Sequence, residues 1–85
     1  MTALVISRKN CRYCTMTKML LKSVNMKSEI IDVSEFTDEQ NREIVAKYNI
    51  PHWEDEDGKI RFRKPQVFLY GSHVGGFTEL KAHYS

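Results

Sequence analysis

The stretch Ala3–Cys14, with the sequence ALVISRKNCRYC, decides the predicted fold. Its first part, Ala3–Ile6, is a short apolar run that predicts a buried strand, and residues 12–25 have the pattern of a helix. Cys11 and Cys14 therefore fall where the strand turns into the helix. Backbone N–H groups and the helix dipole at such a position favour a thiolate. Two thiols spaced i, i+3 can also close a small disulfide, so the motif predicts thiol–disulfide exchange.

The chain has 85 residues, which leaves room for one domain, and we expect residues 1–85 to form it. The first apolar run stops at Arg8 and Lys9, so it is shorter than the about 7–15 apolar residues of a secretory signal or the about 20 of a membrane span. We therefore expect a soluble cytoplasmic protein without a membrane partner. Two cysteines cannot form a secreted disulfide scaffold, and in the cytoplasm such a pair is more often catalytic or metal-binding than structural.

The net charge of +2 is unevenly distributed along the chain. Residues 8–27 carry six basic groups and no acid, residues 29–57 carry ten acids, and residues 58–64 carry four basic groups and no acid. Basic groups thus surround the cysteines in sequence. They are either solvated faces or the source of a field that favours a thiolate and attracts anionic thiol substrates. No stacking aromatics are interleaved with them, which argues against a nucleic-acid partner.

The rest of the chain alternates between strand and helix patterns. Thr37 and Gln40 fit a capping box at the start of the second helix, and a strand–helix–strand order demands a parallel strand pair. Residues 49–64, with a turn signal at Asp57-Gly58, fit either a small hairpin or an irregular loop. The further segments are a strand at 29–33, a helix ending at about 48, strands at 66–70 and 73–74, and a helix at 78–84.

Together these segments predict an α/β, thioredoxin-like fold. It has a four-stranded mixed sheet flanked by three helices, in the order strand, helix, strand, helix, strand, strand, helix. In the first helix the spacing places four residues near one apolar face: Tyr13, Met16, Leu20 and Val24. The residues expected to point inward from the other two helices are Ile44, Val45, Tyr48, Leu80 and Tyr84.

Three motifs, in this order, resemble the signatures of glutaredoxins: CRYC at 11–14, KPQVF at 64–68 and GGFTEL at 75–80. The common family forms are C-P-Y-C, [TV]-V-P-Q-[VI]-F and G-G-x-[DS]-[DE]-L. The resemblance spans essentially the whole chain, and its closest form is the short phage-encoded glutaredoxin, sometimes called phage thioredoxin. It implies a dithiol thiol–disulfide oxidoreductase.

The resemblance also implies roles for individual residues. Cys11 would be the exposed nucleophile and Cys14 the more buried resolving thiol. Tyr13 would flank a glutathione site, and Arg8 would face the glycine carboxylate of glutathione. Pro65 would be a cis-proline beside the disulfide.

The remaining site residues follow from the second and third motifs. The backbone of Lys64 would pair like a strand with the substrate cysteine. Gly75 and Gly76 would let the chain approach closely, and the N–H groups of Phe77 and Thr78 would hold the γ-glutamyl carboxylate at a helix N-terminus.

The chain departs from the family pattern at several places. Arg12 replaces the usual proline and adds a positive charge beside both thiols, which favours the reduced form. Thr78 stands where an acidic residue commonly holds the glutathione amine, which argues against tight glutathione binding. Lys64 is an unusual residue before the cis-proline. The segment 49–64 is longer than the usual family loop, and partner recognition is one use for it.

The resemblance implies reduction of protein or glutathione mixed disulfides through Cys11 and Cys14, with no tightly bound cofactor and with glutathione as co-substrate. Glutathione or thioredoxin reductase would regenerate the dithiol. Ribonucleotide reductase is a disulfide-containing protein partner by family analogy alone. We expect a monomer that acts in the cytoplasm, which for a phage-encoded protein is that of the host.

Two other classes of function use the same residues differently. In a metal-binding module, Cys11 and Cys14 would form half of a zinc site or share a [2Fe–2S] cluster between two subunits with glutathione. Zinc needs about four ligands, and only the scattered His52, His73 and His83 could complete the set. A redox-inert interaction domain has no need for a dithiol at a basic helix start.

Overall fold

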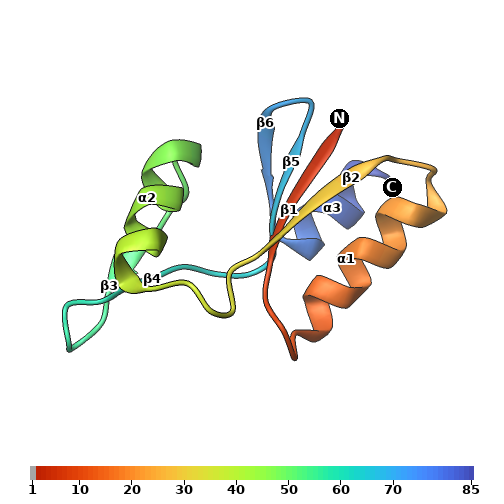
Figure 1. The fold of residues 1–85 in the computed structure, drawn as a ribbon. Helices are drawn as coiled ribbons and strands as arrows, with labels where there is room; N and C mark the ends of the chain where they lie inside the picture. The colour runs from red at the N-terminus through yellow and green to blue at the C-terminus, as the bar shows by residue number, and fades with distance from the viewer. Residues whose placement is uncertain (1) are drawn as a thin grey trace.

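The computed structural model describes residues 2–85 and shows a sheet with helices on both of its faces (Figure 1). No helix within these residues combines the length and the apolar character needed to cross a membrane. The elements are, in order, β1 (Ala3–Ser7), α1 (Arg12–Ser23), β2 (Ser28–Asp32), α2 (Asp38–Tyr48), β3 (Trp53–Glu54), β4 (Ile60–Arg61), β5 (Gln66–Leu69), β6 (Ser72–Gly75) and α3 (Phe77–His83).

Four strands form the main sheet in the order β2-β1-β5-β6. β1 pairs with β2 in parallel, and antiparallel pairs join β1 to β5 and β5 to β6. Every residue of β1 is buried, because this central strand is covered on both faces. The arrangement confirms the predicted α/β, thioredoxin-like fold with a mixed four-stranded sheet and three helices.

Successive residues of β1 point to opposite faces, so the strand contributes to two hydrophobic clusters. Ala3 and Val5 pack in one cluster, which also holds Leu21 of α1 and Leu80 of α3. The second cluster lies on the other face of the sheet, against α2 and β4: Leu4, Ile6, Val33, Ile44, Val45, Ile50, Ile60, Phe62 and Phe68. Figure 1 shows the same division, with α1 and α3 on one side of the sheet and α2 on the other.

The inward residues predicted for α2 and α3 are confirmed. Ile44, Val45 and Leu80 are buried, and Tyr48 and Tyr84 are partly buried against the same clusters. The capping box is also present at the start of α2, where the Gln40 N–H donates to Thr37 Oγ1 at 3.1 Å.

The predicted apolar face of α1 is confirmed for Leu20, which is partly buried against a core cluster, but it is wrong for Tyr13 and Val24. The buried residues of this helix are Cys14, Thr17 and Leu21, whereas Tyr13 is 55% exposed and Val24 is 37% exposed. The buried face of the helix is centred on polar Thr17. A prediction from the apolar residues alone therefore selects a neighbouring face of the helix. The helix also ends at Ser23, because Asn25 adopts a left-handed conformation with φ 57°.

Segment 49–64 contains a hairpin, β3–β4, in which Trp53 pairs with Arg61 and Glu54 with Ile60. Asp55 closes its turn by accepting the Asp57 and Lys59 N–H groups on Oδ1, at 2.9 and 3.0 Å. The prediction left a hairpin and an irregular loop open, and the hairpin is what forms.

Two side chains of α2 hold the hairpin against the helix. The Ile60 N–H donates to Asp38 Oδ1 at 2.7 Å, and Arg42 Nε donates to Asp38 Oδ2 at 2.8 Å. Arg42 also reaches the turn, where Nη2 donates to Gly58 O at 2.6 Å. These bonds lower the pKa of Asp38: the Ile60 N–H contributes most, followed by Arg42.

We predict that acid loosens the hairpin. A carboxyl group with a lowered folded-state pKa stabilises the fold above its ordinary pKa of 3.8, and this contribution is lost as the pH falls through the lower folded-state value. In Asp38→Asn the amide oxygen still accepts from Ile60, but the charge is gone. This variant should unfold at a lower temperature than the parent at pH 6 and match it more closely below pH 3.8. A difference in Tm between Asp38→Asn and the parent that stays constant over this pH range would contradict the prediction.

Candidate active site

The two cysteines form a disulfide at the start of α1, with their Cα atoms 5.2 Å apart. Cys11 is the N-cap of the helix and adopts an extended conformation, with φ −123° and ψ 108°. The Cys14 N–H donates to Cys11 Sγ at 3.2 Å. Cys11 is 8% exposed and Cys14 is 1% exposed, so Cys14 is the more buried residue, as the resemblance implies. The expectation of an exposed Cys11 is wrong for the disulfide form, because both cysteines are buried.

This placement favours negative charge on Cys11 when the disulfide is reduced. A side chain at the N-cap faces N–H groups that have no intrahelical acceptor, and the helix dipole adds partial positive charge there. The Cys14 N–H already points at Cys11 Sγ and would donate more strongly to a thiolate than to a neutral sulfur. Arg12 is exposed at the first helical position and adds a full positive charge next to Cys11.

The second motif lies against the disulfide. The peptide bond between Lys64 and Pro65 is cis, as the family motif implies, and Pro65 is buried. Cys11 Sγ lies 4.0 Å from the carbonyl oxygen of Lys64. The chain just before β5 therefore borders the reactive sulfur.

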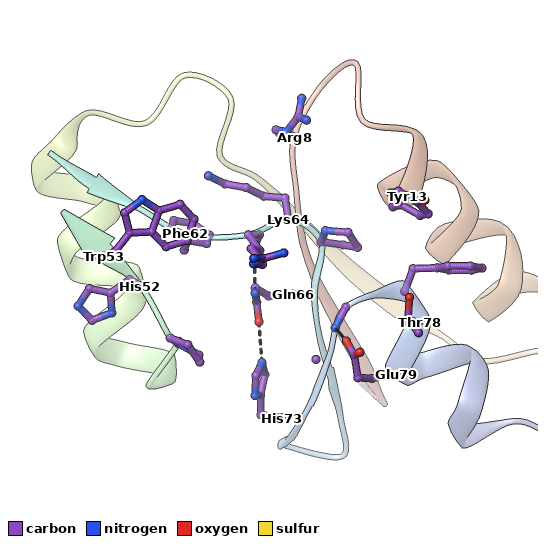
Figure 2. A pocket seen from close by; sticks show the side chains of 16 residues that line it. Arg8, Tyr13, His52, Trp53, Phe62, Lys64, Gln66, His73, Thr78 and Glu79 are labelled. Atoms are coloured by element: carbon purple, nitrogen blue, oxygen red, sulfur yellow. Dashed lines mark hydrogen bonds between the residues drawn. The ribbon is translucent and has the colours of Figure 1, made fainter. Parts of the chain in front are cut away.

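A pocket of about 830 Å³ opens beside this junction (Figure 2). All eight residues predicted to bind substrate or glutathione line it, although they come from four separate parts of the sequence: Arg8, Tyr13, Lys64, Pro65, Gly75, Gly76, Phe77 and Thr78. Figure 2 shows Tyr13 and Thr78 at one end, Lys64 and Gln66 in the middle, and Trp53 and His52 at the other end.

The third motif forms the pocket wall near α1. The rings of Tyr13 and Phe77 lie 6.0 Å apart between centroids. Glu79 Oε1 accepts the Gly76 N–H at 2.7 Å and so caps α3. Gly75 has φ +122°, and a Cβ atom added there would lie 2.8 Å from Glu79 Oε1, so only glycine fits.

The basic side chains of the pocket lack acidic partners among the described residues. The Arg8 guanidinium donates to the carbonyl oxygens of Lys9 and Asn10, both at 3.2 Å. Lys64 Nζ lies 3.9 Å from the centre of the Phe62 ring. Burial lowers the pKa of Lys64, and the positive charges of Arg8 and Arg61 lower it further.

Eight further residues line the pocket without having been predicted: Pro51, His52, Trp53, Phe62, Arg63, Gln66, His73 and Glu79. Gln66 and Glu79 belong to the second and third motifs, so the motifs themselves could have identified them. Gln66 Nε2 donates to Arg63 O at 2.9 Å, and Gln66 Oε1 lies 2.6 Å from His73 Nε2. The residues of the hairpin carry no such signal, apart from Trp53 being the one tryptophan of the sequence.

The comparisons with known proteins agree with this geometry. The family model described as Glutaredoxin matches residues 3–74. The chain belongs to the glutaredoxin family. Glutaredoxins are thiol–disulfide oxidoreductases, so this chain is one as well, and Cys11 and Cys14 lie at the disulfide distance that a dithiol redox pair requires.

Individual relatives share the family over most of the chain. Glutaredoxin 1 of Rickettsia conorii is 35% identical over 93% of this chain and 68% of its own length. The glutaredoxin of Enterobacteria phage T4 is 33% identical over 87% of this chain and 84% of its own length. The crystal structure of glutaredoxin 1 from Francisella tularensis superposes with a TM-score of 0.69 at 26% identity, and it covers 96% of this chain and 90% of its own.

The arrangement gives the metal-binding alternative few ligands. Within residues 2–85, no three or more His, Cys, Asp or Glu side chains come together as a group that could hold a metal ion. A zinc or [2Fe–2S] module would therefore have only the cysteine pair among the described residues.

We predict that Arg12→Pro slows alkylation of Cys11 by iodoacetamide near pH 6, because it removes the positive charge next to the sulfur. Proline is tolerated at the first helical position, which Arg12 occupies, so the fold should persist. A charge pair near the surface is worth roughly 0.2–1 kcal/mol, which corresponds to a slowing of about 1.4- to fivefold. Lys18→Gln, on the exposed part of the same helix, is the matched control. An unchanged rate in Arg12→Pro would show that Arg12 does not favour the thiolate.

Proposed function

We propose that this glutaredoxin reduces glutathione mixed disulfides and protein disulfides by a dithiol mechanism. The observation that carries the proposal is the Cys11–Cys14 disulfide next to Lys64, which lines a pocket formed by residues of all three family motifs. Cys11 is the nucleophile, because it is the less buried of the two cysteines and caps the helix. Cys14 is the resolving thiol.

The reaction proceeds in two exchanges. The Cys11 thiolate attacks one sulfur of the substrate disulfide; that S–S bond breaks, a mixed disulfide with Cys11 forms, and the leaving thiolate takes up a proton. Cys14 then loses its proton and attacks Cys11 Sγ, which releases the second substrate thiol and closes the Cys11–Cys14 disulfide. The substrate gains two electrons and two protons, and the protein dithiol is oxidised.

Several groups support glutathione as the co-substrate. At neutral pH glutathione carries two carboxylates and one ammonium group, and the pocket lining offers basic Arg8 for one of the carboxylates. The first N–H groups of α3, on Phe77 and Thr78, have no acceptor within the helix and can donate to the γ-glutamyl carboxylate. The backbone of Lys64 can pair with the cysteine of glutathione beside cis-Pro65. Tyr13 would flank the bound tripeptide.

The physiological acceptor is proposed as a disulfide-containing protein, with ribonucleotide reductase as the example that the family suggests. Two glutathione molecules, or thioredoxin reductase, would return the Cys11–Cys14 disulfide to the dithiol. Measuring turnover of one protein disulfide with each reductant in turn separates these two routes.

We predict that the two cysteine variants separate the two steps. Cys11→Ser should abolish reduction of the glutathione–mercaptoethanol mixed disulfide, measured by coupling to glutathione reductase and NADPH. Cys14→Ser should retain this activity, because glutathione itself can resolve the mixed disulfide with Cys11, but it should lose reduction of insulin. A Cys11→Ser variant with full activity toward either substrate would refute the proposed mechanism.

We further predict that Thr78→Asp improves glutathione recognition. A carboxylate at this exposed pocket position would accept from the glutathione ammonium group, and charge-assisted hydrogen bonds are the stronger kind. The KM for the glutathione mixed disulfide should fall by about two- to tenfold with little change in kcat, since one such bond contributes on the order of 1 kcal/mol. Ser72→Asp adds the same charge at an exposed position outside the pocket and should leave KM unchanged. An unchanged KM in Thr78→Asp would place the ammonium group elsewhere.

A further inference from the structure

We propose that the pocket has a second subsite on the hairpin side, which binds an acidic polypeptide segment flanking the substrate disulfide. The subsite is formed by Trp53 and Phe62 together with the basic side chains of Arg63 and Lys64. This inference rests on the proposed function in taking a protein disulfide as a substrate, and it adds the chemistry by which that substrate is selected.

The first argument is the extent of the pocket. Its volume of about 830 Å³ lies near the upper end of the about 300–1,000 Å³ that is usual for small-ligand pockets. Figure 2 shows that it continues past Lys64 to Trp53 and His52, away from the end formed by Tyr13 and Thr78. A substrate with a main chain on both sides of its cysteine can occupy both ends, whereas the residues proposed for glutathione account for one.

The second argument is charge. Within the described residues, Arg8, Arg63 and Lys64 make no ion pair and all line the pocket. The acid that lines it is Glu79, which already accepts from the Gly76 N–H. The pocket therefore carries an excess of positive charge that an acidic segment would neutralise.

The acids of the hairpin do not cancel this charge. Asp55 pairs with Arg61 at 2.7 Å, and Glu54 pairs with Arg42 at 3.4 Å. Neither Glu56 nor Asp57 lines the pocket.

The third argument is the exposed aromatic surface. Trp53 lines the pocket and is 51% exposed, although a large apolar side chain is usually buried. Exposed aromatic side chains of this kind are common anchors of protein interfaces. Lys64 Nζ lies over the Phe62 ring, 3.9 Å from its centre, so its charge is held on the hairpin side rather than beside the disulfide. An acidic side chain that binds there would contact Lys64 and Arg63 while its neighbours cover Trp53.

The experiment compares three peptides that each contain one intramolecular disulfide and differ only in the residues around the cysteines: aspartate, asparagine or lysine. The reduced protein transfers two electrons and two protons to the peptide and becomes the Cys11–Cys14 disulfide, so no glutathione takes part. At low ionic strength we expect the aspartate peptide to be reduced about tenfold faster than the asparagine peptide, and the lysine peptide to be slowest. The differences should shrink as salt is added, because exposed charges are screened.

Variants identify the subsite. Arg63→Gln should lower the aspartate-to-asparagine rate ratio by about threefold, which lies within the range for an exposed charge pair. Lys59→Gln removes the same charge from the same hairpin outside the pocket and should leave the ratio unchanged. Trp53→Ala should slow all three peptides, and Trp53→Phe should restore most of the rate. None of these variants should change turnover of the glutathione–mercaptoethanol mixed disulfide.

A binding measurement makes the result independent of the redox reaction. Trp53 is the sole tryptophan, so its fluorescence in the oxidised protein reports occupation of the subsite by peptides with serine in place of both cysteines. The aspartate peptide should change this fluorescence at lower concentration than the asparagine peptide, and Arg63→Gln should weaken that binding. Equal binding of the peptides, or a rate ratio that Arg63→Gln leaves intact, overturns the subsite. If the unmodified protein prefers the aspartate peptide but does not turn over the glutathione–mercaptoethanol mixed disulfide, the glutathione part of the proposed function is refuted instead.

Discussion

The antiparallel pairing of β1 with β5 is the constraint on which the site depends. Ile6, near the end of β1, lies opposite Gln66, at the start of β5. The segment after β1, which carries the cysteines, and the segment before β5, which carries Lys64 and Pro65, therefore meet at one end of the sheet. β6 runs back along β5 and ends at Gly75, opposite Val67, which brings the third motif to the same end. Three motifs separated by tens of residues therefore meet because of strand register, and the buried apolar sequence of β1 fixes that register.

The sequence predicted the parts of this arrangement that have strong local signals. The apolar run of β1, the capping box at Thr37 and the strand residues at 67–69 are each sufficient to mark an element, and the binding residues predicted from the motifs line one pocket. The buried face of α1 was missed because burial there depends on how the helix lies on the sheet. Leu21 and polar Thr17 face the core, while apolar Tyr13 stays exposed beside the pocket.

The hairpin was one of two predicted alternatives for 49–64, but its position against α2 could not be predicted because it depends on contacts distant in sequence. Asp38 stands in the first turn of α2, where an acid is expected from the helix dipole alone. Because the helix dipole alone explains an acid here, the sequence gives no sign of its second contact, in which Asp38 accepts a hydrogen bond from the Ile60 N–H, 22 residues away. Arg42 likewise looks like the partner of an i, i+4 pair, yet it also reaches Gly58 O. Asp38 and Arg42, one turn apart on α2, thus hold the hairpin whose ends lead to Trp53 and Phe62 on the pocket wall.

The chemistry of the disulfide cannot select among protein substrates, because the same two sulfurs exchange with any accessible disulfide. Selection has to come from contacts beside the sulfurs, and the hairpin side of the pocket offers Trp53, Phe62 and Arg63 for such contacts. Lys64 is half-buried, and this burial lowers its pKa, which the positive charges of Arg8 and Arg61 lower further. A carboxylate bound at this place would offset that repulsion and raise the pKa of Lys64 again. The unfavourable placement of Lys64 in the free protein is therefore the counterpart of a favourable interaction with an acidic partner.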